Sequence, residues 1–268
     1  MPSLKPLGAD ESIFSNIDSL NAEFVPKFLP HREEEQKTIA QAIKPLCDGK
    51  CCRNLLVFGS SGIGKTHAVK RVLEDMLSES SEVLCAYANC WVYDKSGEIL
   101  AKLCADLGYS VKAAENSAQL LARIKSRNEE KPIVFVFDEI DQADELDFLY
   151  SVLEEVQDRA VIAITNSNKW LAGLDERIRS RFLPQELEFR AYSKEEILDI
   201  MRERRKFAFY QDTWSREAAE ILDEKTAELG DVRAGIQLMR EAGLAAEEKA
   251  SRIVMEEHAL SAVKKLFP

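Results

Sequence analysis

The stretch GSSGIGKT, from Gly59 to Thr66, fits the pattern G-x-x-x-x-G-K-S/T at every fixed position. It follows the apolar run NLLVFG, which reads as a buried strand, and it opens KTHAVKRVLEDML, which reads as a helix. In that context the glycines let the chain wrap a phosphate with its N–H groups inward, and the start of the helix adds partial positive charge. We therefore predict a phosphate-binding loop in which Lys65 reaches the β- and γ-phosphates and Thr66 is a ligand of Mg²⁺. The alternative is an unrelated glycine turn.

Polar side chains at the ends of two further apolar runs extend the predicted site. IVFVFDE reads as a buried strand that ends in Asp138 and Glu139, and AVIAITN as another that ends in Asn166. Asp138 is suited to hold the Mg²⁺ shell, and Glu139 to orient or deprotonate a water molecule for attack on the γ-phosphate. The Asn166 amide would hydrogen-bond that water or the phosphate. The alternatives are strand ends that merely exit to solvent and a common turn asparagine. Asp141 is a weaker candidate that caps the next helix instead.

The apolar runs and the helices between them decide the fold class. Besides the three strands above, EVLCAYANC and QELEFR read as strands, and helical segments alternate with them. This alternation predicts an α/β domain with a five-stranded parallel sheet covered by helices on both faces. The expected helices include residues 31–47, before the first strand, and residues 96–108 and 117–127, between later strands, the last with Ser117 as its N-cap.

From Tyr192 onward the pattern changes to helices alone. Four segments have helical periodicity, and no strand candidate remains. We therefore expect three parts: a loosely tethered N-terminal arm over residues 1–23, the α/β domain over 24–190 and an all-α domain over 191–268.

Composition narrows the functional class. The chain has 268 residues, of which 46% are hydrophobic and 31% charged, as in a soluble globular protein. No run approaches the ~20 apolar residues of a membrane span, and the N-terminus is too polar for a signal peptide, so we expect a cytoplasmic protein without a membrane partner.

A net charge of −11 argues against a DNA-coating protein, so any DNA contact depends on a local patch and weakens with salt. Six cysteines without a CxxC pair and three scattered histidines do not have zinc-site spacing.

Three arginines stand at a spacing of two in LDERIRSRF: Arg177, Arg179 and Arg181. In an acidic chain such a cluster has three interpretations. The guanidinium groups lie on the solvent-exposed face of a helix, bind DNA phosphates, or interact with a charge that another molecule supplies. The spacing alone leaves these interpretations open.

In combination, the motifs carry a resemblance to a known family. The phosphate-binding loop, DEID, ITN, LDERIRSRF and GDVR follow one another, with a helical lid, in an order that resembles the AAA+ ATPases. More narrowly, the chain is similar to the archaeal and eukaryotic replication initiators, the origin-recognition and cell-division-control family. The segments that carry this similarity are FVPKFLPHREEE, ANCWVYDKSGEILAKLCADLG, EFRAYSKEEILDIMRERRKFAF and GDVRAGIQLMREAGLAAEE. It extends from about Ile13 to Val263.

The resemblance implies roles by position. Nucleotide would be contacted by the loop and the start of the next helix, by two residues near the adenine, and by three lid residues, of which Arg233 senses the γ-phosphate. These positions are Ser61, Gly62, Ile63, Gly64, Lys65, Thr66, His67, Val25, Pro26, Tyr192, Arg204 and Arg233. Arg181 would be an arginine finger that reaches the ATP of a neighbouring subunit, Arg177 a second one, and Arg179 a plain surface residue. Without the resemblance, Arg204 and Arg233 are equally well interpreted as surface cations. Val25, Pro26 and Tyr192 are then interpreted as ordinary packing residues.

The resemblance also implies a function. The chain would bind ATP or ADP with Mg²⁺, hydrolyse ATP slowly, assemble on origin DNA with itself or with paralogous AAA+ subunits, and recruit the replicative helicase. Family members usually carry a winged-helix domain after the lid. Because this chain stops at Pro268, we expect it to lack that domain and to bind DNA weakly. The alternatives are a nucleotide-locked scaffold that does not hydrolyse ATP, another AAA+ DNA-transaction ATPase such as a clamp-loader subunit, and, ranked last, a kinase.

Overall fold

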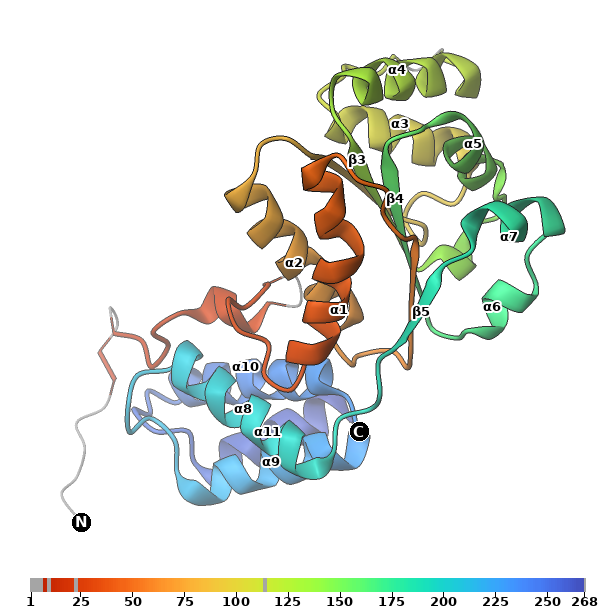
Figure 1. Ribbon diagram of the computed structural model, residues 1–268. Coiled ribbons are helices and arrows are strands. Elements are labelled where there is room, and N and C mark those ends of the chain that lie inside the picture. Colours follow the sequence, from red (N-terminus) through yellow and green to blue (C-terminus); the bar gives the residue numbers. More distant parts are fainter. Residues whose placement is uncertain (1–6, 9–10, 22–23, 113–114, 268) are drawn as a thin grey trace. The chain divides into compact units, whose positions relative to one another are not determined.

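The computed structural model describes residues 7–8, 11–21, 24–112 and 115–267 (Figure 1). The chain divides into two compact units. Arg32–Arg190 form an α/β unit, and the described residues up to His31 form a helical unit together with those from Ala191 onward. The expected three-part division stays a prediction, and the units differ from it because residues 24–31 belong to the helical unit.

The α/β unit is built on one parallel sheet of five strands. The strands are β1 Leu55–Phe58, β2 Leu84–Asn89, β3 Ile133–Asp138, β4 Arg159–Thr165 and β5 Gln185–Glu188. Their order is β2-β3-β4-β1-β5, and every neighbouring pair is parallel. The predicted five-stranded parallel sheet is therefore confirmed. The central strands β1, β3 and β4 are recognisable because a parallel strand buried on both faces is apolar at nearly every position.

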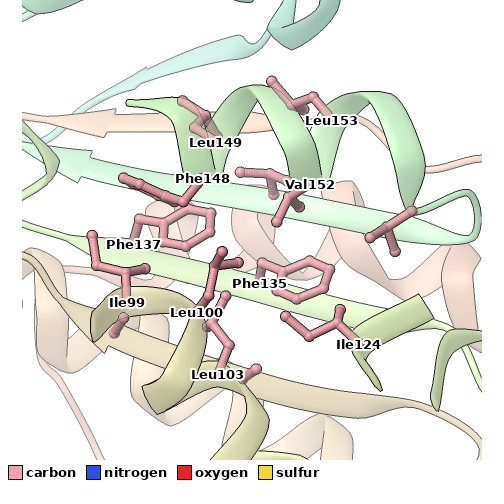
Figure 2. Packing of buried hydrophobic residues seen from close by; sticks show 14 of the residues in the cluster. Ile99, Leu100, Leu103, Ile124, Phe135, Phe137, Phe148, Leu149, Val152 and Leu153 are labelled. Atoms are coloured by element: carbon pink, nitrogen blue, oxygen red, sulfur yellow. The ribbon is translucent and has the colours of Figure 1, made fainter. Parts of the chain in front are cut away.

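Alternation along β3 assigns its side chains to the two faces of the sheet. Phe135 and Phe137 enter an aromatic and aliphatic core, where the Phe137 and Phe148 rings lie 4.9 Å apart (Figure 2). Helices α3 (Ser96–Asp106), α4 (Ser117–Glu130) and α5 (Asp147–Glu155) supply the other labelled side chains of this core. Figure 1 shows α1 (Glu33–Ile43) and α2 (Lys65–Glu79) on the opposite face of the sheet. All six β3 residues are buried, so this strand is fixed from both sides.

Among the described residues of the α/β unit, four helices agree with the predicted segments, with local differences, and three shorter ones had no predicted bounds. Their bounds are α1 Glu33–Ile43, α2 Lys65–Glu79, α3 Ser96–Asp106, α4 Ser117–Glu130, α5 Asp147–Glu155, α6 Lys169–Ala172 and α7 Glu176–Phe182, with 3₁₀ turns at Lys44–Asp48 and Ile140–Gln142. The predicted cap at Ser117 is wrong. Asn116 is the N-cap, because its side chain accepts a hydrogen bond from the backbone N–H of Gln119 while the Gln119 side chain reaches back to it. Asp141 lies within a 3₁₀ turn, and α5 begins after Leu146.

The helical unit contains the four helices predicted from the C-terminal segments. They are α8 Lys194–Ala208, α9 Arg216–Leu229, α10 Val232–Glu248 and α11 Glu256–Leu266. Ser193 and Ser215 cap the first two of them. Their apolar faces share one core, in which Met201, Leu238 and Met239 are fully buried.

The N-terminal segment is part of this helical core, so the expectation of a loosely tethered arm is wrong for residues 11–21. Ile13 and Phe14 are 2% and 6% exposed, and the Phe14 ring lies 4.7 Å from that of Phe209. The backbone N–H of Ile13 and the hydroxyl of Ser12 both donate to the carboxylate of Glu247 on α10. A short 3₁₀ helix, Ile17–Leu20, follows. The segment lacks periodicity because single anchors, not a helical face, bury it.

A close contact on α10 gives a test of this packing. A Cβ atom at Gly243 would lie 2.4 Å from Cζ of Phe14 and 2.8 Å from Cε1 of Phe209. We expect Gly243→Ala to lower the free energy of unfolding by about 1–3 kcal/mol, because an overpacked core must shift. Gly97→Ala is the control, since its Cβ would meet only the Ser117 hydroxyl at 3.8 Å. Urea melts that show equal effects for the two variants would contradict the anchoring role of Phe14.

Candidate active site

The predicted polar residues meet at the carboxyl-terminal edge of the sheet. The strands β3, β4 and β1 are neighbours, and each ends in a part of the predicted site: Asp138 ends β3, Asn166 follows β4, and the glycine-rich loop follows β1. Because the ends of parallel strands lie at the same edge, residues far apart in the sequence come within hydrogen-bonding distance there.

The loop between β1 and α2 has a conformation that depends on glycine. Gly59, Gly62 and Gly64 have φ angles of +146°, +82° and +92°, which side-chain-bearing residues rarely adopt. A Cβ atom at Gly59 would also lie 2.3 Å from the backbone oxygen of Phe189. Gly64 is the N-cap of the fifteen-residue helix α2, so the loop ends at a helix N-terminus, whose partial positive charge favours an anion.

Lys65 is held at this edge by three acceptors. Its Nζ donates to the backbone oxygens of Gly59 and Ser60, at 2.7 and 2.8 Å, and to Oδ1 of Asn166 at 3.0 Å. The residue is only 6% exposed. Hydrogen bonds from an ammonium group satisfy its charge where water is largely excluded. The contact with Asn166 links the loop directly to the end of β4.

Asp138 is the acceptor on which the second half of the site depends. The residue is 2% exposed. Its Oδ2 accepts hydrogen bonds from the hydroxyls of Thr66, at 2.9 Å, and Tyr87, at 2.7 Å, and its Oδ1 accepts one from the N–H of Glu139 at 3.0 Å. A hydroxyl and a carboxylate this close fit Mg²⁺, which takes hard oxygen ligands and completes its shell with water and substrate phosphates. Burial, followed by the charge of Asp138, raises the pKa of Tyr87, so its phenol stays protonated.

Glu139 lies next to Asp138 in a strained backbone conformation. Its φ of +51° is left-handed, which is uncommon for a residue other than glycine and often marks functional sites. Its Oε2 accepts a hydrogen bond of 2.7 Å from Nδ2 of Asn166. Burial and then the nearby Asp138 charge raise the pKa of Glu139, while Asn166 and Lys65 act in the opposite direction. Asn166 therefore joins the ammonium of Lys65 to the carboxylate of Glu139.

The three arginines lie on helix α7, and the helical period separates them. Ile178 and Phe182 face the core, and Arg179 is exposed. Arg177 and Arg181 are four residues apart and therefore share a side of the helix. Their guanidinium carbons lie 5.8 and 5.0 Å from the ring centroid of Tyr150.

Each of these two arginines also has a carboxylate partner. Arg181 pairs with Glu154 on α5, and its Nη1 donates to the backbone oxygen of Arg177. Nε of Arg177 lies 3.1 Å from Oδ1 of Asp175. The guanidinium of Arg181 lowers the pKa of Glu154 through their hydrogen bond. The two arginines are thus arranged as a pair on Tyr150, and Arg179 is not part of it.

The remaining predicted nucleotide contacts belong to the helical unit and stay predictions. Val25, Pro26 and Tyr192 are half-buried there. Arg204 donates to the backbone oxygen of Ser19 at 2.9 Å, and burial lowers the pKa of its guanidinium. Arg233 lies in the first turn of α10, where its backbone N–H donates to Asp231.

Of the predicted loop residues, Ile63 is buried, His67 is half-buried in the first turn of α2, and Ser61 is exposed.

Two residues near the loop were not predicted. Arg32 is fully buried, where its Nε donates to the backbone oxygen of Ile63 at 3.2 Å and its Nη2 to the backbone oxygen of Arg190 at 2.7 Å. Arg32 therefore stabilises the glycine-rich loop. It was not predicted because, within the charged run HREEE, it resembles a surface residue. Tyr87 could have been found from the alternation of β2, since Ala86 and Ala88 face the core and place it on the other face of the sheet.

A glycine-rich loop with a buried lysine, an acidic pair at the end of β3 and an asparagine after β4, on a sheet of this order, are typical of a nucleotide-hydrolase domain. Residues 29–164 match the family model of the AAA ATPase domain, and residues 198–264 match that of the Cdc6 AAA+ ATPase-type lid domain. The chain belongs to the AAA ATPases and carries a lid of the Cdc6 type.

Similar proteins agree with this assignment. The chain is 29% identical to ORC1-type DNA replication protein 2 of Methanothermobacter thermautotrophicus, over 97% of the chain and 72% of that protein. It is 33% identical to ORC1-type DNA replication protein 1 of Sulfurisphaera tokodaii, over 92% of the chain and 65% of the relative. The chain thus spans about two thirds of the relative's length in that comparison.

Solved structures extend the agreement to the fold. The Aeropyrum pernix ORC1 protein, solved in complex with DNA, superposes with a TM-score of 0.88 at 26% identity, covering 96% of the chain and 71% of that structure. A Drosophila ORC structure, with a TM-score of 0.75 and 22% identity, covers 100% of the chain and 70% of that structure, and it supports the fold alone. The resemblance to the origin-recognition and cell-division-control family is confirmed. Among the described residues, no helix combines the length and apolarity of a membrane span.

Proposed function

We propose that this chain is an ATP-binding, slowly hydrolysing replication initiator of the cytoplasm that assembles on origin DNA. The arrangement of Lys65, Asn166 and Glu139, linked by hydrogen bonds of 3.0 and 2.7 Å beside Asp138 and Thr66, is the observation that carries the proposal. In this arrangement the Asn166 amide links Lys65, the proposed phosphate-binding cation, to Glu139, the proposed general base. The ORC1-type names of the relatives support the assignment to replication.

The chemistry follows from the residues at the sheet edge. The N–H groups of the loop and Lys65 would bind the β- and γ-phosphates, and Thr66 and Asp138 would hold Mg²⁺, which neutralises phosphate charge when bound. Glu139, with a raised pKa, would orient and deprotonate the attacking water. Asn166 would hold the Glu139 carboxylate and the water in line. We further propose that Tyr192, Arg204 and Arg233, together with Val25 and Pro26, contribute to nucleotide recognition.

Assembly and partners extend the same proposal. We propose that Arg181, with Arg177 beside it on Tyr150, acts on the ATP of a neighbouring copy or a paralogous subunit. Origin DNA is the proposed ligand, since the similar Aeropyrum pernix ORC1 protein was solved in complex with DNA. With a net charge of −11 the chain should bind it weakly and in a salt-sensitive way. Recruitment of the replicative helicase completes the proposed role.

The test separates an ATPase from a nucleotide-locked scaffold. We expect Glu139→Gln to keep ATP binding and to slow phosphate release by roughly 10²–10⁴-fold, the usual contribution of a positioned general base. Glu145→Gln, the same change at an exposed acid nearby, is the control. Single-turnover phosphate release, with a fluorescent nucleotide to monitor binding, gives both readouts. Equal, measurable hydrolysis rates in the wild type and the Glu139 variant would remove Glu139 from the mechanism. Nucleotide binding by the wild type without any phosphate release would favour the scaffold.

A further inference from the structure

Tyr87 lies on β2, the strand at the edge of the sheet beside β3. In the parallel register it is paired with Val136, two residues before the end of β3. Its phenol nevertheless reaches Oδ2 of Asp138 at 2.7 Å. Strand β2 carries no residue of the predicted phosphate site. Its Tyr87 side chain nevertheless contacts the Asp138 carboxylate, which lies at the centre of that site.

Three features hold this tyrosine in place. Its backbone N–H, on the open side of the edge strand, donates to Oδ2 of Asp106 at 3.0 Å. The ammonium of Lys70 lies 4.7 Å from the centroid of its ring. Lys70 is one turn beyond Thr66 on α2, so the helix that supplies the other hydroxyl on Asp138 also covers the tyrosine ring. The phenol is therefore fixed before any ligand binds.

The hydrogen bonds on Asp138 show what this contact does. Oδ1 is held by the N–H of the next residue, and Oδ2 is shared by the hydroxyls of Thr66 and Tyr87. Thr66 is itself a proposed Mg²⁺ ligand, so Tyr87 is the side-chain donor to Asp138 that has no other role in the proposed site. Without it, the carboxylate keeps Thr66 as its side-chain donor among the described residues, and it can rotate about its terminal bond, which is a broad torsion.

We propose that Tyr87 is a positioning residue that acts through Asp138 to set the Mg²⁺ affinity of the nucleotide site. The inference rests on the proposed function, since it presupposes nucleotide and Mg²⁺ at this edge of the sheet. Groups that hydrogen-bond to a metal-binding residue orient it, and removing them typically weakens metal binding about 10–100-fold. Phosphate binding by the loop and Lys65 does not involve Tyr87, so it should be unaffected.

The experiment measures binding of a fluorescent ADP analogue to the full chain, in EDTA and across a Mg²⁺ titration. For Tyr87→Phe we expect affinity in EDTA within about 2-fold of the wild type and a Mg²⁺ midpoint raised roughly 10–100-fold. Tyr93→Phe makes the same chemical change at a tyrosine packed against the aromatic core, and it should leave both quantities unchanged.

A double-variant cycle keeps the proposal distinct from a packing role. In an Asp138→Asn background, Tyr87→Phe should have no further effect on the Mg²⁺ midpoint, because the contact through which it acts has been altered. A lowered melting temperature with an unchanged Mg²⁺ midpoint would overturn the proposal and make Tyr87 a packing residue. The wild type reports separately on the function: nucleotide binding that Mg²⁺ does not strengthen would overturn both the Mg²⁺ site and the role of Tyr87.

Discussion

Replacing Lys65 by alanine is expected to reduce ATP affinity by roughly 100-fold or more. The ammonium would make at least two charge-assisted hydrogen bonds to phosphate, each contributing about 1.5–3 kcal/mol, and 1.4 kcal/mol corresponds to a factor of ten. The loss should be large because Lys65 is buried and already oriented by Gly59, Ser60 and Asn166. Little conformational freedom is lost when phosphate replaces those acceptors.

The measurement is a titration with a fluorescent ATP analogue, accompanied by a thermal melt. The melt matters because Lys65→Ala leaves the Asn166 amide and two backbone oxygens without their donor, and it removes the cation that lowers the pKa of Glu139. Lys37→Ala, on an exposed turn of α1, removes the same charge far from the loop in sequence and should bind normally. A folded Lys65 variant with wild-type affinity would refute the phosphate site at its first step.

Sequence patterns predicted the sheet and the centre of the site for a definite physical reason. Buried parallel strands are continuous apolar runs, and the glycines, Lys65, Asp138 and Asn166 stand at their ends, where the chain must turn. The short helices α6 and α7 were not predicted as helices, since four and seven residues give too few turns for a period to show.

Other features depend on contacts that no local pattern contains. Ile13 and Phe14 are buried by helices more than a hundred residues away in sequence, so residues 11–21 looked like a free arm. Arg32 occupies a charged run but is fully buried against the loop. The cap of α4 is a different case, because Asn116 followed by Gln119 is a capping box that could have been read from the sequence.

Replacing Arg181 by alanine is expected to leave nucleotide affinity of the isolated chain within about 2-fold of the wild type, since no phosphate contact within the chain is proposed for it. In the assembled state we expect hydrolysis to fall by roughly 10³–10⁵-fold, the contribution of an arginine that stabilises transition-state charge in trans. Arg181 is presented for such a role by Tyr150 and Glu154. Because the pair with Glu154 is solvent-exposed, water screens it, and a phosphate can replace the carboxylate as its partner.

Rate per subunit as a function of protein concentration, with DNA present, is the decisive measurement. A finger that acts in trans predicts a rate per subunit that rises with concentration in the wild type and stays flat in the Arg181 variant. Arg179→Ala is the matched control, because it removes the same charge from the opposite side of the same short helix and should follow the wild type. If Arg179→Ala lowers the rate as much as Arg181→Ala, the cluster acts as general positive charge. If Arg181→Ala weakens nucleotide binding by the monomer, the arginine acts within its own chain, and the proposed neighbour is not required.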